Sequence, residues 1–263
     1  MTHVSEGKLR VERDGPIGRL VLDNPARRNA IGAGMWRAIP PAVSGFESDP
    51  AIRCIVVRGE GTVAFAAGAD ISEFEERRST EEGVRTYEAL VDATHQALER
   101  SRKPVIAQIY GFCVGGGLAT ALSCDLRFAV ASSQFAIPAA KLGLAYGVGG
   151  TSRLVATVGH AFAREIMYTA RRFTADEALA MGLVNRVLPD DQLEEYVRQI
   201  TLTIAQNAPL TIAATKTLID ELIAPAGTFD ASREAIARCM GSADYAEGRR
   251  AFMEKRKPKF EGR

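Results

Sequence analysis

The chain has little of what marks several classes of protein. Its 263 residues include only four cysteines, with no CxxC pair and no Cys/His spacing typical of a metal site. We therefore expect free thiols from a reducing compartment and no metal centre. No apolar run approaches the ~20 residues that a membrane-spanning helix needs, and the first eight residues lack the apolar segment of a secretory signal. These absences predict a cytoplasmic protein.

The chain also lacks an excess of either charge. Lys and Arg together number 33 and Asp and Glu 32, so composition predicts neither a nucleic-acid nor a membrane partner. Positive charge gathers only locally, at Arg27-Arg28 and in the segment 249–259. The apolar content of 46% is enough for a substantial core.

The order of apolar runs predicts an α/β protein. Short β-like runs alternate with helical stretches from Leu9 to about Phe135, which is typical of repeated ββα units. Beyond Gly150 the pattern is mostly helical. We expect an α/β core over residues 1–200 and a helical region over 201–263, both within one structural unit.

Two local signals in the helical stretches are specific. The sequence from Thr174 to Glu177 fits a capping box, which predicts that a helix begins there. Pro40-Pro41 falls inside the otherwise helical stretch from Met35 to Phe46, which predicts that this helix is kinked or begins later.

Two glycine-bearing turns are the most informative feature. The turn 65–70 and the turn 111–117 each follow an apolar β-like run, at 54–57 and 105–109. Glycine lets a ligand approach the backbone closely, and the start of a helix leaves unpaired N–H groups. Together the turns predict an anion-stabilising site, whereas either turn alone is equally typical of a tight connection without a ligand.

Several segments in order make the chain resemble the crotonase family, also called the enoyl-CoA hydratase/isomerase family. The resemblance covers nearly the whole chain. Besides the two turns, it rests on the segments 24–30, 149–154, 178–184 and 247–256. It implies a crotonase fold, in which ββα units form a spiral core and a C-terminal helical region assembles a homotrimer or a dimer of trimers. It also implies activity on an acyl-CoA thioester in fatty-acid or related catabolism.

In that family two backbone N–H groups bind the thioester oxygen, which becomes negative as an enolate forms. Matched by motif, these donors are Ala69, just after Gly68, and Gly116, the middle glycine of three. Donors aimed at charge that appears only in the transition state each contribute ~2.7–4 kcal/mol in comparable oxyanion holes.

The resemblance also implies where coenzyme A is held. CoA is part of the substrate, so no separate cofactor is expected. The implied contacts are Arg28, Ala67, Asp70, Ile71, Phe252 and Lys255. In relatives the residues matching Phe252 and Lys255 often come from a neighbouring subunit and reach the nucleotide.

The departures from the family pattern concern its two catalytic glutamates. They match Ala119 and Ala139 here, and a methyl group neither donates nor accepts a proton. General acid–base groups typically contribute ~10²–10⁴-fold each, so ordinary two-glutamate hydration is not expected.

Few side chains are placed to replace the glutamates. Tyr146 lies where relatives commonly have a proline and where the loop approaches the acyl pocket. Some decarboxylases of the family resemble this chain in having a tyrosine at a similar place. With an ordinary pKa of ~10 its hydroxyl suits an acid or an anchor, unless the ring merely packs under the loop with the hydroxyl in water. Asp70 and Glu73 are typical of helix starts, and His95 and His160 fall in predicted helices far in sequence from either turn.

Two classes of function therefore follow from the sequence. One is an enzyme acting on acyl-CoA, either of the hydratase/isomerase type or a decarboxylase or hydrolase that uses Tyr146. The other is a non-catalytic acyl-CoA-binding paralogue that has lost its glutamates. A family resemblance by itself does not choose between them.

Overall fold

The structure is a computed structural model that describes residues 7–70, 73, 80–223 and 229–263. The strands are β1 (Lys8–Asp14), β2 (Ile17–Asp23), β3 (Cys54–Gly59), β4 (Ala64–Ala66), β5 (Val105–Ile109), β6 (Phe112–Val114), β7 (Leu126–Val130), β8 (Gln134–Ala136), β9 (Phe173–Thr174) and β10 (Arg186–Leu188). The α-helices are α1 (Ala33–Ser48), α3 (Glu81–Glu99), α4 (Gly116–Leu122), α5 (Val148–Thr169), α6 (Ala175–Ala180), α7 (Leu193–Gln206), α8 (Pro209–Ile223), α9 (Asp230–Met240) and α10 (Ala243–Met253). Short 3₁₀ turns cover Pro25–Arg27 and Pro138–Leu142.

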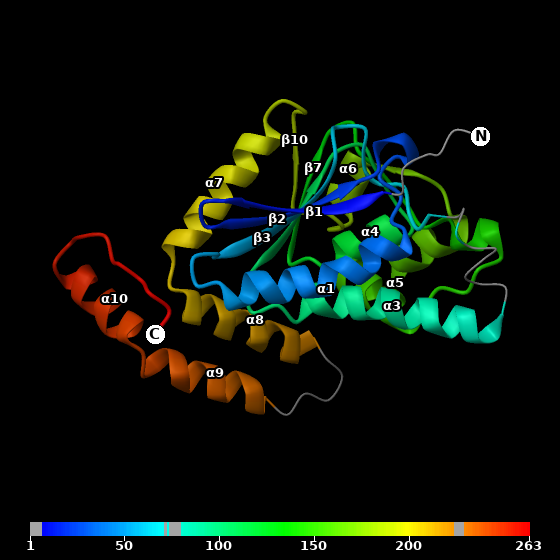
Figure 1. Ribbon diagram of the computed structural model, residues 1–263. Helices are drawn as coiled ribbons and strands as arrows, with labels where there is room; N and C mark the ends of the chain where they lie inside the picture. Colours follow the sequence, from blue (N-terminus) through cyan, green and yellow to red (C-terminus); the bar gives the residue numbers. More distant parts are fainter. Residues whose placement is uncertain (1–6, 71–72, 74–79, 224–228) are drawn as a thin grey trace.

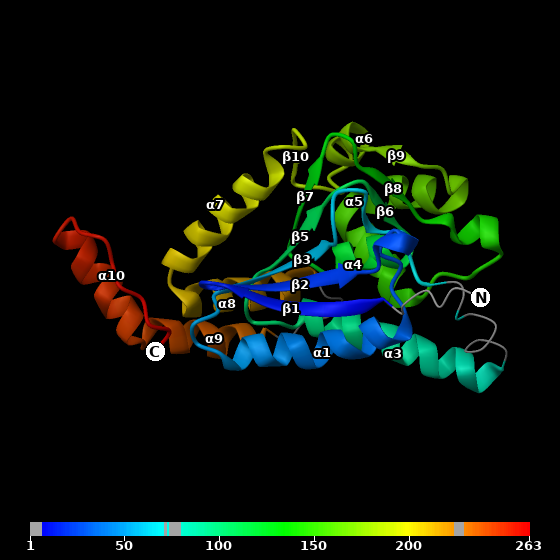
Figure 2. The ribbon, with the colours of Figure 1, turned by 45° about the horizontal axis from the view of Figure 1, so that its top comes forward.

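The strands form two sheets that confirm the predicted ββα repeat. The larger sheet has the order β1-β2-β3-β5-β7-β10, and the smaller one β4-β6-β8-β9. Each of β3, β5 and β7 is followed at once by a short strand of the smaller sheet, so the chain winds through both sheets in parallel steps. The central strands are apolar on both faces, as parallel strands covered by helices usually are. Figure 2 shows β6 and β8 beside α4 and α5.

Helix α1 corrects one expectation. It begins at Ala33, ahead of Pro40 and Pro41, and runs through both prolines to Ser48, so it does not begin later. Each proline removes a backbone donor. This cost is offset because the same helix buries Trp36, Ile39, Val43 and Phe46 in the main apolar cluster.

The predicted capping box is confirmed at the start of α6. The Thr174 hydroxyl accepts a hydrogen bond from the backbone N–H of Glu177, and the Glu177 carboxylate accepts one from the backbone N–H of Thr174. Two orphan donors at the helix start are thereby satisfied.

The C-terminal region is helical, as expected. Helices α8, α9 and α10 follow one another, with a break after Met240, and α10 projects away from the rest of the chain at the end opposite α4 (Figures 1 and 2). The predicted boundary between the α/β core and the helical region, at 200/201, falls inside helix α7. The division of the chain at that point stays a prediction. None of the helices in the described ranges has the length and apolar character needed to cross a membrane.

Candidate active site

The two glycine-bearing turns meet because the strands before them are paired. Strands β4 and β6 run parallel, so their carboxyl ends lie at the same edge of the smaller sheet. A Cβ placed on Gly116 would lie 3.2 Å from the amide nitrogen of Ala69, and one placed on Gly68 would lie 3.8 Å from that of Gly116. Within the described residues, neither amide donates to a backbone or side-chain acceptor. The turns therefore present two neighbouring N–H groups.

Glycine is required at both turns. Gly68 and Gly115 have φ of +118° and +54°, in the region that L side chains rarely adopt. Gly117 is required for a different reason, since a Cβ there would come within 2.4 Å of the Ala66 carbonyl oxygen. This close approach seats α4 directly on β4.

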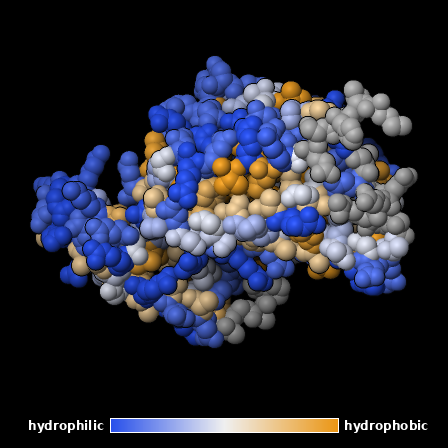
Figure 3. All heavy atoms as spheres, viewed as in Figure 1, coloured by the Kyte–Doolittle hydropathy of each residue, from blue (hydrophilic) through white to orange (hydrophobic). Residues whose placement is uncertain are grey.

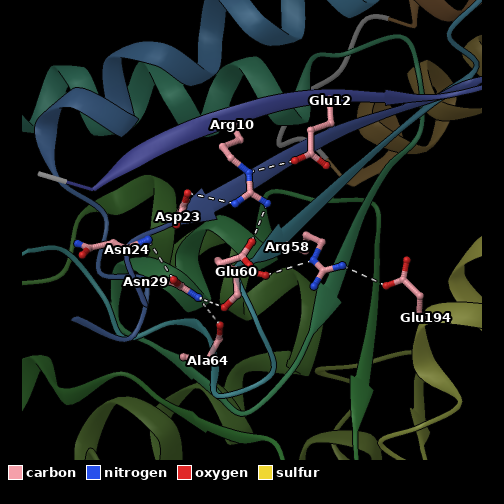
Figure 4. Close-up of polar contacts among 10 residues, drawn as sticks. Arg10, Glu12, Asp23, Asn24, Asn29, Arg58, Glu60, Ala64 and Glu194 are labelled. Atoms are coloured by element: carbon pink, nitrogen blue, oxygen red, sulfur yellow. Dashed lines mark hydrogen bonds and ion pairs between the residues drawn. The ribbon is translucent and has the colours of Figure 1, made fainter. Parts of the chain in front are cut away.

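A loop from the N-terminal part of the chain fixes the first turn. The backbone N–H of Ala67 donates to the carbonyl of Arg28 at 2.9 Å, and that of Ile31 donates to Gly68 at 2.8 Å. The Asn29 side chain accepts from the N–H of Asn24 at 3.1 Å and donates to the Ala64 carbonyl at 2.7 Å, as Figure 4 shows. The backbone geometry at Ala69 is thus held from two sides.

Both positions of the missing glutamates lie in the core. Ala119 in α4 and Ala139 in the turn after β8 are each 4% exposed, and both belong to the main apolar cluster. The side chains at the two positions that the resemblance assigns to the glutamates are therefore buried methyl groups.

The Tyr146 hydroxyl is buried, so it does not lie in water. It has no hydrogen-bond partner among the described residues. Burial raises the pKa of Tyr146 to about 12. The ring packs over Gly150, where an added Cβ would come within 2.6 Å of it. An unpartnered buried donor of this kind typically costs ~1–3 kcal/mol of stability, a cost that functional sites often retain.

The acidic residues after the first turn are engaged in structural contacts. The Asp70 carboxylate accepts from the Arg27 guanidinium at 2.6 Å. The Glu73 carboxylate accepts from the backbone N–H of Ala33 at 2.8 Å, at the start of α1. Most of the segment after the first turn lies outside the described residues, so the expectation that these two carboxylates are helix-start charges stays a prediction.

The expected CoA contacts lie in two places. Ala67 lies within the first turn and Asp70 ends it, while Ile71 lies outside the described residues. Arg28 adjoins the turn, since its carbonyl accepts from the backbone N–H of Ala67. Phe252 is 84% exposed and lies with Lys255 at the end of α10, away from the two turns. The basic C-terminal segment is partly paired internally, since Arg250 and Arg256 both contact the Glu247 carboxylate.

An arginine that sequence reasoning missed contacts the same aromatic ring as Arg28. The guanidinium carbons of Arg28 and Arg172 lie 4.9 and 5.2 Å from the centroid of the Phe112 ring. Two positive charges therefore contact Phe112, in the turn that begins at Gly111. The Arg171-Arg172 pair before Phe173 was the only sequence signal for it.

A second group missed by sequence reasoning surrounds Trp36. A Cβ on Gly116 would lie 3.4 Å from Cζ2 of Trp36, so this ring borders the two amides. The Trp36 indole N–H donates to the Tyr87 hydroxyl at 3.0 Å, and the His95 ring stands edge-on to Trp36 with centroids 5.6 Å apart. His95 is far from both turns in sequence, but it contacts the Trp36 ring, which borders the two amides. His160 is exposed on α5 and contacts Arg164.

The four thiols are free, and three of them are buried. Burial raises the pKa of Cys54 and of Cys124 to about 12, and that of Cys113 well above its ordinary value. These three side chains are therefore neutral thiols and not nucleophiles at neutral pH. No cluster of metal-ligating side chains occurs in the part of the chain that the structure describes.

Comparisons with known proteins find relatives that match nearly the whole chain. The family model described as enoyl-CoA hydratase/isomerase matches residues 12–263. A short-chain-enoyl-CoA hydratase of Clostridium acetobutylicum is 35% identical over 94% of this chain and 95% of its own length. A crotonyl-CoA hydratase of Syntrophomonas wolfei is 34% identical over 95% of this chain and 96% of its own.

A solved structure is equally similar. The crystal structure of an enoyl-CoA hydratase/carnithine racemase from Magnetospirillum magneticum superposes with a TM-score of 0.93 at 36% identity, covering 98% of this chain and 97% of that one. The chain belongs to the enoyl-CoA hydratase/isomerase family and has the crotonase fold.

Proposed function

We propose that the protein is an enzyme that acts on an acyl-CoA thioester by stabilising the thioester enolate between the backbone N–H groups of Ala69 and Gly116. The observation that carries the proposal is the juxtaposition of these two amides at the shared edge of β4 and β6. Hydrogen bonds to Arg28 and Ile31 hold the backbone of the first turn in place, which supports a pre-organised site for the negative charge that develops on the oxygen. CoA enters and leaves as part of the substrate, and the proposed chemistry needs no other cofactor.

We further propose that the reaction is not ordinary two-glutamate hydration. The buried methyl groups of Ala119 and Ala139 supply no proton, whereas the buried Tyr146 hydroxyl stays protonated at neutral pH. Tyr146 suits a reaction in which a hydroxyl orients an acyl group or donates one proton, such as decarboxylation, hydrolysis or isomerisation of an acyl-CoA. This argument favours such a reaction over hydration.

We propose that Arg28, Ala67 and Asp70 border the CoA moiety, and that Phe252 and Lys255 of a neighbouring copy complete its nucleotide end. The distance between α10 and α4 supports an intermolecular arrangement. Large apolar side chains are exposed along the C-terminal helices: Ile219, Leu222, Ile223, Ile236, Met240, Phe252 and Met253. Such a surface favours self-association, here as a homotrimer or a dimer of trimers. Light scattering of the purified protein tests this assembly, and a monomer would contradict it.

The experiment that tests the proposed function is incubation with enoyl-, malonyl- and β-hydroxyacyl-CoA thioesters, followed by mass spectrometry of the products. Conversion of at least one thioester by the wild-type protein, reduced at least tenfold in Tyr146→Phe, supports the enzyme. Binding of thioesters without conversion of any would instead identify a non-catalytic paralogue.

A further inference from the structure

A cavity of about 180 Å³ lies at the amino ends of β3 and β5. Its walls include Arg53, just before β3, and Lys103 and Pro104, just before β5. From there the chain runs the length of each strand before it reaches one of the two turns, a distance of about 16–20 Å for strands of this size. The cavity is therefore separate from the site built on Ala69 and Gly116, and the proposed function makes no use of it.

Much of the cavity wall is apolar. Ile204 comes from α7, and Leu210 and Ile212 come from α8. Ile52 and Pro104 add apolar surface from the side of the sheet. An apolar cavity of about 150 Å³ in another protein holds a benzene molecule. The cavity therefore has room for a hydrocarbon group of about six carbon atoms.

The rest of the lining carries more positive than negative charge. The charged residues are four cations and two carboxylates: Arg53, Arg102, Lys103 and Arg238 against Glu47 and Glu261. Both carboxylates already have partners. Glu47 accepts from the backbone N–H of Arg102 at 2.7 Å and lies 3.9 Å from its Nε. Glu261 pairs with Arg263 at 2.6 Å, outside the lining.

The positive charges of Arg53, Lys103 and Arg238 are not neutralised. Within the described residues, none of the three has a carboxylate at ion-pair distance. The half-buried Lys103 ammonium donates to two backbone carbonyls. The half-buried Arg53 guanidinium donates from Nη2 to the Phe260 carbonyl at 3.0 Å, and its other N–H groups have no partner in the described part of the chain. Neutral carbonyls do not cancel a charge, so these residues attract an anion.

The C-terminal tail closes one side of the cavity. A Cβ on Gly262 would come within 3.2 Å of Pro209 and 3.6 Å of Nη1 of Arg53, so the tail passes close to both. The Asp244 carboxylate at the start of α10 accepts from the backbone N–H groups of Glu261 and Gly262, at 2.7 and 2.8 Å. Figures 1 and 2 show the end of the chain beside α9. The tail is thus held in place as a wall of the cavity.

We infer that this cavity is a second ligand site, which binds a free short-chain monocarboxylic acid. The hydrocarbon part lies against Ile204, Leu210 and Ile212, and the carboxylate accepts from the N–H groups of Arg53 that Phe260 leaves unused. A cavity of this size does not hold a CoA nucleotide, so the ligand is the free acid. The inference goes beyond the proposed function and does not depend on it.

The test is calorimetric titration of the purified protein with hexanoate, with its neutral match hexanamide, and with inorganic phosphate. We expect hexanoate to bind about ten times more tightly than hexanamide, because hydrogen bonds to a charged group are the stronger ones. Phosphate should bind more weakly than hexanoate, since it gains nothing from the apolar walls. Hexanamide or phosphate binding as tightly as hexanoate, or no binding of hexanoate, would overturn the inference.

Variants of the lining locate the bound acid. Arg53→Gln removes the charge and Ala213→Leu fills the cavity, so each should weaken hexanoate binding about tenfold or more. The control is Arg233→Gln, an exposed position on α9 outside the lining, which should leave the affinity unchanged. If neither lining variant folds, Arg238→Gln, at an exposed position, decides: it should weaken binding about threefold or more.

A variant of the first site separates the two sites. Gly116→Ala should leave hexanoate binding unchanged, because Gly116 lies at the other end of the strands. Loss of hexanoate binding in Gly116→Ala, with binding retained in Ala213→Leu, would place the acid at the two turns and overturn the second site.

Discussion

Gly116 lies beside both the Trp36 ring and the Ala69 amide. A Cβ on Gly116 would come 3.4 Å from Cζ2 of Trp36 and 3.2 Å from the amide nitrogen of Ala69. The space that a methyl group would fill is the space in which we place the thioester oxygen.

Gly116→Ala should therefore abolish most activity, and because the added Cβ would lie 3.2 Å from a backbone nitrogen, urea unfolding should measure its stability alongside. The methyl group would displace the oxygen from the amides, and removing one donor of this kind costs about 10²–10³-fold in kcat. The control is Gly45→Ala on the exposed side of α1, where an added Cβ meets nothing within 4 Å. Steady-state kinetics on the substrate identified by the thioester panel would measure both variants, and unchanged turnover in Gly116→Ala would place the oxygen elsewhere.

Hydration of crotonyl-CoA by the wild-type protein should be slow. Each missing general acid–base group is worth ~10²–10⁴-fold, and both positions hold buried alanines. Ala119→Glu with Ala139→Glu should raise the hydration rate, and the matched pair Ala119→Gln with Ala139→Gln should not. A wild-type kcat/KM of ~10⁶ M⁻¹s⁻¹ or more would mean that another residue supplies the base.

Tyr146→Phe should lower activity without lowering stability. The substitution keeps the ring and removes a buried hydroxyl that has no partner among the described residues, so the free energy of unfolding should stay the same or rise by ~1 kcal/mol. Turnover should fall at least tenfold. Urea unfolding and kinetics on the same preparation separate the two effects, and a loss of stability equal to the loss of activity would assign Tyr146 to packing.

His95 should make the protein sensitive to mild acid. Its pKa is lowered to about 3 in the folded state, whereas an unfolded histidine titrates near ~6.5. Between these values the unfolded state binds one more proton, so stability falls as pH decreases, by up to about 1.4 kcal/mol per unit. His95→Gln should flatten the dependence between pH 6.5 and 5, and His160→Gln should not. Equal slopes in the wild-type protein and His95→Gln would show that His95 titrates normally.

The strands and the turns could be predicted because their signals are local. The apolar run Val105–Ile109 forms a strand with the expected bounds, and a helix begins after Thr174 as its capping box indicates. The start of α1 ahead of Pro40 and Pro41 could not be predicted with certainty from the sequence, since burial of Trp36 and its neighbours outweighs the local penalty of the prolines.

The surroundings of the two amides were less accessible to sequence reasoning. Trp36 lies on α1 and His95 on α3, and nothing in their local sequence indicates that the two rings pack together with Trp36 beside Gly116. Their proximity depends on how the helices pack against the smaller sheet. Arg172 was missed for the same reason. It contacts the same Phe112 ring as Arg28, and these two arginines are more than a hundred residues apart in the sequence.

Binding at the nucleotide end should depend on salt. Lys255→Ala should weaken acetyl-CoA binding, and added salt should weaken it in the wild-type protein, because pairs between ammonium and phosphate are screened over ~10 Å at 0.1 M. Lys8→Ala, at an exposed position on β1, is the control. Calorimetry at two salt concentrations measures both effects, and equal affinities for wild type and Lys255→Ala would remove Lys255 from the CoA site.

The most direct measurement compares butyryl-CoA with S-butyl-CoA, the thioether that lacks only the carbonyl oxygen. Two hydrogen bonds from Ala69 and Gly116 to that oxygen, at ~0.5–1.5 kcal/mol each, predict that the thioester binds about tenfold more tightly. The preference should disappear in Gly116→Ala and persist in Gly45→Ala. Equal affinities of the wild-type protein for the thioester and the thioether would contradict the account.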